Sequence, residues 1–130
     1  MEWVNSVGVL FAADYRFPPG ARLARKREFD RVFRRPQHRF RNGPLRLVAA
    51  ENRMCASRLG VVAPRRVLRR AIDRNRAKRH IRESFRYARA RLPNCDIVIV
   101  VTGFGDGRPI RAGEVRRAAD ALWEKLCREP

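Results

Sequence analysis

The sequence predicts an α/β (α+β) two-layer sandwich, with one small, mostly antiparallel sheet. Three observations favour it. Apolar residues make up 45% of the 130 residues, which is normal for a globular chain and sufficient for one domain. In the run 96–102 (DIVIVVT), every residue after the aspartate is β-branched, which is typical of a strand covered on both faces. Segments 72–92 and 112–127 instead repeat apolar residues at the spacing of one helix face.

The N-terminal part divides into an appendage and a short helix. Residues 1–16 lack the charge density of the adjoining segment, so we expect an appendage, either a mobile tail or the product of an early start codon, before a single domain at 17–130. Segment 25–35 (RKREFDRVFRR) is expected to be helical, because Phe29, Val32 and Phe33 share one face and a proline comes directly after it.

Strands and turns alternate with helices in the rest of the chain. We expect a polar, basic loop at 37–44, strands at 45–50 (LRLVAA) and 58–63 (RLGVVA), a strand at 96–102 and a glycine-rich turn at 103–109. The last helix, 112–127, is expected to face the core with Val115, Ala118, Ala119, Leu122 and Leu126, with Trp123 beside this stripe.

The central segment, 65–91, concentrates positive charge. It holds twelve Arg or Lys residues against Asp73 and Glu83, a net charge of +10 out of +18 for the chain. An apolar stripe on this helix is formed by Ala77, Ile81, Phe85, Ala88 and Leu92. The opposite face carries Asn75, Lys78, Arg79, Arg82, Arg86 and Arg89. One helix therefore has an apolar edge for the core and a cationic edge.

Two interpretations of this cationic face are open: a solvated surface, or a site for a polyanion. Solvated helices normally mix signs, because like charges four residues apart repel. Lys78, Arg82 and Arg86 have this spacing, with no acid in the series to relieve the repulsion, which favours the polyanion. The segment 22–46 adds ten basic residues against two acids. Since most of the bases are arginine, which pairs with phosphate and stacks on bases, we expect nucleic acid, and RNA in particular.

Aromatic residues accompany the charge in the first basic segment. Phe29 and Phe33 are either core anchors or a stacking platform for unpaired bases. We expect a cleft between the sheet, the first helix and the start of the long helix, walled by Phe29, Phe33, Arg66, Arg74 and Asn75.

Catalytic, metal and membrane sites are not indicated. The few carboxylates are scattered, whereas metal-dependent phosphodiester cleavage needs them clustered. Cys55, Cys95 and Cys127 lack zinc-ligand spacing and are typical of reduced thiols, so we expect a cytoplasmic protein. No apolar run reaches the roughly 18 residues that a membrane span requires.

Several strings resemble the protein subunit of bacterial ribonuclease P. They are Arg58-Leu59-Gly60, Arg65-Arg66, Arg74-Asn75-Arg76-Ala77-Lys78-Arg79 and Ile81-Arg82-Glu83-Ser84-Phe85-Arg86. Glu28-Phe29 with Val32-Phe33 is similar to the family's first helix, and Leu92-Pro93 with 96–100 to its last strand. The resemblance covers about 16–128.

This resemblance implies a function and a left-handed crossover in the fold. In the family, a catalytic RNA hydrolyses the phosphodiester with Mg²⁺ held mainly by that RNA. The protein binds this RNA and the 5′ leader of precursor tRNA. Leader contacts would come from Phe29, Phe33, Arg65, Arg66, Arg74 and Asn75, and catalytic-RNA contacts from Arg76, Lys78, Arg79, Arg82 and Arg86.

Other functions remain open from the residues alone. A general RNA-binding or ribosome-associated protein would share the basic helix without needing an aromatic cleft. DNA binding is less favoured, because no companion helix precedes residue 72 in helix-turn-helix fashion. Binding at a membrane surface is least favoured, because the apolar stripe is needed by the sheet. Neither the oligomeric state nor the leader preference is determined by the sequence.

Overall fold

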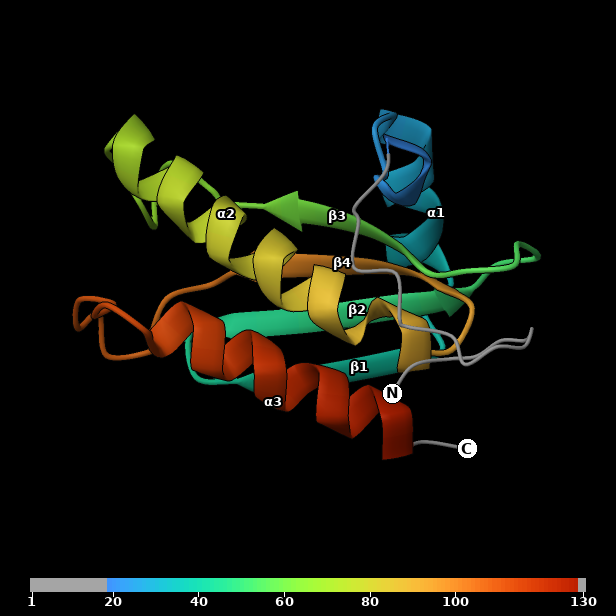
Figure 1. Cartoon of the computed structure of the whole chain (residues 1–130). Helices are drawn as coiled ribbons and strands as arrows, with labels where there is room; N and C mark the ends of the chain where they lie inside the picture. Colours follow the sequence, from blue (N-terminus) through green and yellow to red (C-terminus); the bar gives the residue numbers. More distant parts are fainter. Residues whose placement is uncertain (1–18, 129–130) are drawn as a thin grey trace.

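The computed structural model describes residues 19–128 and confirms the α+β fold class (Figure 1). The expected appendage at 1–16 lies outside the described residues. The elements are a 3₁₀ turn η1 (Pro19–Ala21), α1 (Lys26–Arg34), β1 (His38–Asn42), β2 (Leu45–Glu51), β3 (Arg58–Val62), α2 (Ala71–Ala88), a 3₁₀ turn η2 (Arg89–Arg91), β4 (Cys95–Val101) and α3 (Glu114–Arg128).

The sheet is mixed, and its last strand occupies an inner position. The strand order is β1-β2-β4-β3. β2 is antiparallel to both β1 and β4, while β3 and β4 are parallel. In Figure 1, β3 and β4 point the same way, α2 lies in front of them, and β4 lies below β3. This arrangement makes the β3–α2–β4 crossover left-handed, against the usual right-handed rule and in agreement with the resemblance.

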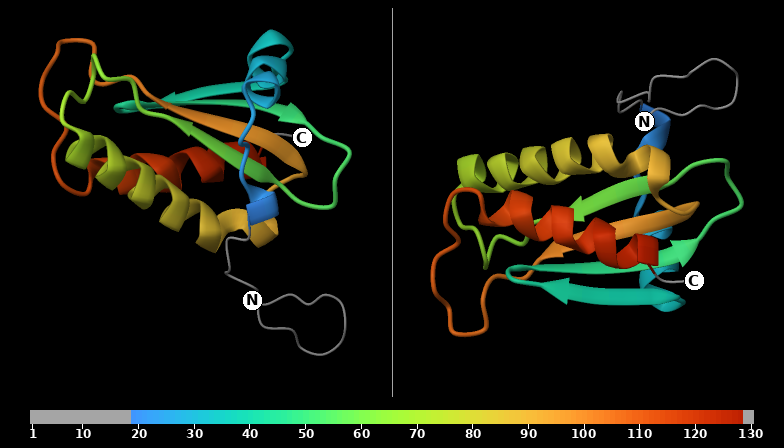
Figure 2. Two further views of the ribbon diagram at one scale, coloured as in Figure 1. Left: turned by 90° about the horizontal axis from the view of Figure 1, so that it is seen from above. Right: turned by 60° about the horizontal axis from the view of Figure 1, so that its bottom comes forward.

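Helices cover the two faces of the sheet unequally. α2 and α3 lie side by side on one face, and α1 crosses the other (Figure 2). The stripe predicted for the long helix is buried as expected, and so is the stripe predicted for α3. Trp123 is buried as well, edge-on to Phe85, and its indole N–H donates to Ser84 Oγ at 2.7 Å. Every residue of β4 is buried, which confirms a strand covered on both faces.

The prediction of a loop at 37–44 is wrong, because β1 occupies most of this segment. His38–Asn42 pairs antiparallel with β2, and Gly43, with φ +52°, makes the tight turn between the two strands. Only Phe40 packs against the main core, while Arg39 and Arg41 are exposed. An edge strand with so little apolar surface has the composition of a loop, although its charged and aromatic residues alternate with a period of two.

A close contact joins α1 to the sheet. The Phe29 ring lies directly over Gly60 in β3, where a Cβ atom would be 2.4 Å from Phe29 Cε1. Val32, one turn further along the same side, is fully buried against Val48 and Val98. Gly60 is therefore the residue that allows the first helix to approach the sheet.

Replacing Gly60 by alanine should destabilise the fold. We expect a loss of about 1–3 kcal/mol in the free energy of unfolding, because the added methyl overlaps a packed ring. Denaturant unfolding measures this loss. Gly105→Ala is the matched control, because nothing lies within 4 Å of its added carbon. Adding Phe29→Leu to Gly60→Ala should recover part of the loss; equal stability of the two alanine variants would contradict the contact.

Candidate nucleic-acid interface

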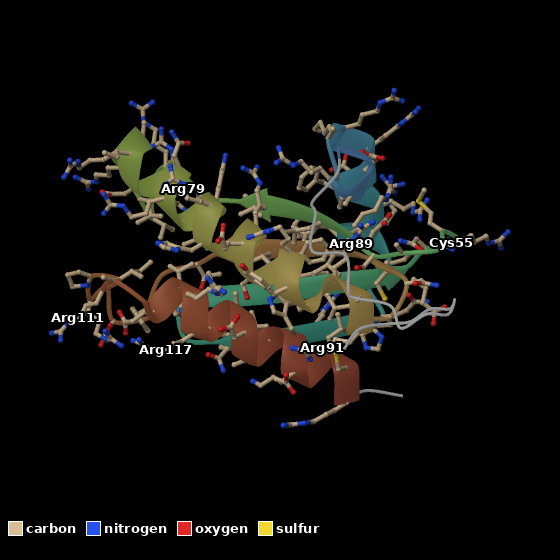
Figure 3. The ribbon with its side chains drawn as sticks, in the orientation of Figure 1. Cys55, Arg79, Arg89, Arg91, Arg111 and Arg117 are labelled. Atoms are coloured by element: carbon tan, nitrogen blue, oxygen red, sulfur yellow. The ribbon has the colours of Figure 1, made fainter. Side chains whose placement is uncertain are left out.

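The outer face of α2 is cationic along most of its length. Arg76 and Arg79 are exposed and Lys78 and Arg82 half-buried, and none of them forms an ion pair with another described residue. Burial, together with the nearby charge of Arg22, lowers the pKa of Arg82. Figure 3 shows Arg79 extending from the early turns of the helix. Uncompensated charge on a folded helix is the electrostatic arrangement that a polyanion stabilises.

Arg86, further along the same helix, is engaged within the protein. Its guanidinium lies 3.4 Å from Glu83 Oε1 and 4.7 Å from the centre of the Tyr87 ring. Arg89 donates to the Ser57 carbonyl at 3.2 Å. The cationic face is therefore densest over the first three turns of α2.

The segment before α2 presents further arginines. Arg65, Arg66, Arg69 and Arg70 are all exposed, and so is Asn75 in the first turns of the helix. Arg74 points back instead, and its Nη1 donates to the carbonyls of Leu68 and Arg69 at 3.0 and 2.8 Å. We define the α2 surface as Arg65, Arg66, Arg69, Arg70, Asn75, Arg76, Lys78, Arg79 and Arg82.

A second basic surface lies on the sheet face that α1 only partly covers. The register places Arg39 opposite Val48 and Arg41 opposite Arg46, and Val48 belongs to the cluster beneath α1. All three arginines therefore share that face and are exposed. Like charges directly opposite each other repel, so Arg41 and Arg46 form a site that an anion would stabilise.

The two phenylalanines of α1 have different environments. Phe29 is half-buried over Gly60, whereas Phe33 is 39% exposed. Helical spacing puts both on the same side of α1, away from Arg27, Arg31 and Arg35. We define the sheet-face surface as Phe33, Arg39, Arg41 and Arg46. The sequence did not reveal its three arginines as a group, because two of them lay in the presumed loop.

The expected cleft walled by Phe29, Phe33, Arg66, Arg74 and Asn75 does not form as one hollow. α1 packs on the opposite sheet face from α2, and the start of α2 lies at the far end of β3 (Figure 2). Arg66 instead lines a hollow with the loop that connects β4 to α3. The predicted residues are thus divided between two surfaces.

A buried ion pair lies beside α1, on the same sheet face as the sheet-face surface. Arg58 donates to both carboxylate oxygens of Asp96 at 2.9 and 2.7 Å and to Glu28 at 3.0 Å. Asn52 adds a bond to Asp96 at 2.8 Å. Burial of Asp96 favours its neutral form, but the hydrogen bonds from Arg58 and Asn52 outweigh it and lower its pKa. The Arg58 side chain thus connects β3, β4 and α1.

Neither a metal cluster nor a membrane-spanning helix is found in the part of the chain that the structure describes. Residues 19–128 contain no group of three or more His, Cys, Asp or Glu side chains placed to hold a metal ion. Within the same residues, no helix combines the length and apolar character needed to cross a bilayer.

Two arginine-rich surfaces on an α+β sandwich define a protein suited to a polyanion such as a nucleic acid, and comparison with known proteins gives its family. The sequence model of the family described as Ribonuclease P matches residues 17–127. The chain belongs to this ribonuclease P protein family, which confirms the resemblance seen in the sequence.

Individual relatives agree in sequence and in fold. The ribonuclease P protein component of Halorhodospira halophila is 51% identical over 92 residues, covering 71% of this chain and 75% of the relative. That of Pasteurella multocida is 39% identical over 110 residues, covering 82% and 87%. The RNase P protein of Thermotoga maritima superposes with a TM-score of 0.65 at 26% identity, covering 84% and 97%. The Staphylococcus aureus protein, at 19% identity, shares the fold, with a TM-score of 0.70 over 83% and 95%.

Replacing Asp96 by asparagine should destabilise the protein and change its response to acid. We expect a loss of roughly 3 kcal/mol at pH 7, because Arg58 would lose its buried partner. The lowered pKa of Asp96 means that its contribution is present above the ordinary value of 3.8 and is lost as the pH falls through the folded-state pKa.

Denaturant unfolding between pH 7 and pH 3 measures both effects. The native chain should lose more stability over this interval than Asp96→Asn does. Asp106→Asn, at an exposed turn, is the matched control and should behave as the native chain does. Parallel pH profiles for Asp96→Asn and the native chain would contradict an ionised, paired Asp96.

Proposed function

We propose that this chain is the protein subunit of ribonuclease P, which assists a catalytic RNA in removing the 5′ leader from precursor tRNA in the cytoplasm. The observation that carries this proposal is the α2 surface, a group of cationic side chains with few acidic partners, in a chain that belongs to this family. Arginine forks bind phosphates bidentately, and their number accounts for binding through the RNA backbone.

The α2 surface supplies contacts to the catalytic RNA in this proposal. Arg76, Lys78, Arg79 and Arg82 project from consecutive turns of one rigid helix. A rigid row of cations fits a folded RNA better than a mobile tail does, because less conformational entropy is lost on binding. Arg86, held by Glu83 and Tyr87, contributes less to this contact than the other four.

The sheet-face surface supplies contacts to the leader. A single strand offers unstacked bases, which bind to aromatic rings while arginines track the backbone. Phe33 is the exposed ring of α1, and Arg39, Arg41 and Arg46 are the neighbouring cations on the open sheet. Phe29, half-buried between α1 and β3, supports this site from below. Arg65, Arg66 and Asn75 lie on the α2 surface, so in this proposal they contact RNA there, and Arg74 orders the segment that carries them.

Catalysis belongs to the RNA in this proposal. Mg²⁺ would be held mainly by phosphates of the RNA subunit, and the protein would lower the repulsion between that RNA and its substrate. A general RNA-binding protein is the second candidate. Leader dependence distinguishes them, because only a ribonuclease P subunit has reason to prefer a precursor over mature tRNA.

The deciding experiment reconstitutes the enzyme from the full chain and the RNA subunit. At low Mg²⁺, precursor tRNA should be cut at the mature 5′ end only when both are present. The complex should also bind precursor more tightly than mature tRNA. Equal affinities for the two, with no effect of the protein on cleavage, would exclude the proposed role and favour the second candidate.

Phe33→Ala should weaken leader binding selectively. We expect the affinity of the reconstituted enzyme for precursor tRNA to fall roughly fivefold or more, since one base stack contributes about 1–3 kcal/mol. Affinity for mature tRNA should not change. Tyr87→Ala is the matched control, because this ring is 49% exposed on α2, the helix that covers the other face of the sheet. A similar loss for both substrates would argue against a leader contact at Phe33.

Arg79→Ala and Arg82→Ala should each reduce the salt dependence of binding to the RNA subunit. Each lost phosphate contact lowers the slope of log affinity against log salt by about one. Titrations at several salt concentrations give this slope, and Arg128→Ala at the exposed end of α3 is the control. Slopes equal to that of the native chain would show that these two side chains stay solvated in the complex.

A further inference from the structure

A hollow of about 720 Å³ lies beyond the C-terminal ends of β3 and β4, away from α1. It is enclosed by the segment 66–70, the first turns of α2 and the loop 102–113. Because β3 and β4 are parallel, the segments that follow them leave the sheet at the same end. The carboxyl ends of parallel strands are a common place for ligand sites in α/β proteins. The volume falls within the range of about 300–1,000 Å³ that is usual for ligand sites.

Internal hydrogen bonds fix the wall that precedes α2. The backbone N–H groups of Val67 and Leu68 donate to the Pro64 carbonyl at 3.0 and 3.1 Å, which forms a tight turn. Arg74 then donates to the carbonyls of Leu68 and Arg69 from the first turn of the helix. Because these bonds already order the segment, a ligand that binds beside it would cost little conformational entropy of the protein.

The opposite wall is anchored to the β1–β2 turn. The N–H groups of Thr102 and Gly103 both donate to the Pro44 carbonyl, at 2.8 and 3.2 Å. Gly103 has φ +74°, and a Cβ there would be 3.2 Å from Val67 Cγ1. The left-handed glycine conformation thus allows the two walls to meet and close one side of the hollow.

The lining combines an apolar floor with a cationic rim. Val67, Leu68, Phe104 and Ile110 supply apolar surface, and all four are half-buried. The arginines of the rim are Arg66, Arg69, Arg70, Arg76, Arg108 and Arg111. Figure 3 shows Arg111 at the same end of the molecule as Arg79, which extends the cationic region beyond α2.

Half of this rim has no partner within the described residues. Arg70 reaches Asp73 at 4.0 Å, and Arg108 binds Glu114 at 3.2 Å while it covers the Phe104 ring at 3.6 Å. The guanidinium groups of Arg66, Arg69 and Arg76 form no ion pair or hydrogen bond with residues 19–128, while Arg111 lies within electrostatic reach of Glu114. A row of guanidinium groups around an apolar floor favours an occupant that is anionic at its edge and planar or apolar in its centre.

We propose that this hollow holds one unpaired nucleotide of RNA, with its base on the apolar floor and its flanking phosphates among the rim arginines. A base-paired nucleotide does not fit this role, because its faces are stacked and its edges are engaged. The site is distinct from the leader surface, which is on the other face of the sheet. This proposal rests on the proposed function only because both take RNA as the ligand.

Two kinds of substitution separate this site from a simple cationic patch. Arg66→Ala with Arg111→Ala removes rim charge, and Arg117→Ala with Arg128→Ala is the control of equal charge. Ile110→Ser alters the floor, and Met54→Ser, at an exposed loop far from the hollow, is its control. Binding of the full chain to the RNA subunit, and of the reconstituted enzyme to precursor tRNA, is measured across a range of salt concentrations.

The double substitution Arg66→Ala with Arg111→Ala should lower the affinity for RNA about tenfold or more and reduce the slope of log affinity against log salt by about two. Ile110→Ser should lower affinity about fivefold or more without changing the slope, since it removes apolar contact with the base and apolar contact releases no counterions. A loss with the RNA subunit alone identifies that RNA as the source of the nucleotide, and a loss seen only with precursor identifies the precursor. The proposal would be overturned if the Ile110→Ser variant, with a normal melting temperature, bound both RNAs as tightly as the Met54→Ser variant does.

A photo-crosslinking amino acid in place of Arg111 keeps the test decisive if Ile110→Ser unfolds the chain. In the complete enzyme, it should crosslink to an unpaired nucleotide. Crosslinks confined to base-paired segments, or no more crosslinking than from position 128, would overturn the site. Leader-dependent cleavage by the native chain is scored separately, so this site can fail while the proposed function stands.

Discussion

The structure depends on covering both faces of β4. This strand is buried throughout, so its β-branched side chains need apolar partners above and below the sheet. Two long helices cover most of one face, whereas α1, with nine residues, crosses only part of the other. The uncovered remainder of that face is where Arg39, Arg41 and Arg46 lie. A short first helix therefore both completes the core and leaves a basic sheet surface open to a ligand.

Several acidic residues are used by the fold itself, in ion pairs and at helix starts. Asp96 and Glu28 bind Arg58 across three elements, and Glu28 also accepts the N–H groups of Ala24 and Arg25 at the start of α1. These backbone bonds contribute most to lowering the pKa of Glu28. Glu114 has a similar role at the start of α3. Because 31 basic residues outnumber 13 acidic ones, the chain has a net charge of +18 that partners of opposite sign can neutralise.

Local patterns in the sequence predicted the helices, their buried stripes, β4 and the family, because each is encoded within a short window. The β1 strand was missed, since its pairing with β2 supplies the stability that its own residues lack. The separation of Phe33 from Arg66 was missed as well, because the sheet face on which α1 packs is decided by contacts such as Phe29 against Gly60. Arg74 looked like the other basic residues of α2, and only the turn before the helix shows that it points inward.

The inner position of β4 also governs how the protein emerges during translation. β2 and β3 are not neighbours in the sheet, and the strand that joins them is made only after α2. Until residues 95–101 leave the ribosome, a nascent chain can complete no more of this sheet than the β1–β2 hairpin. Most of its arginines are therefore synthesised before there is a folded scaffold to separate them. Screening by ions or by nearby RNA would limit their mutual repulsion during this interval.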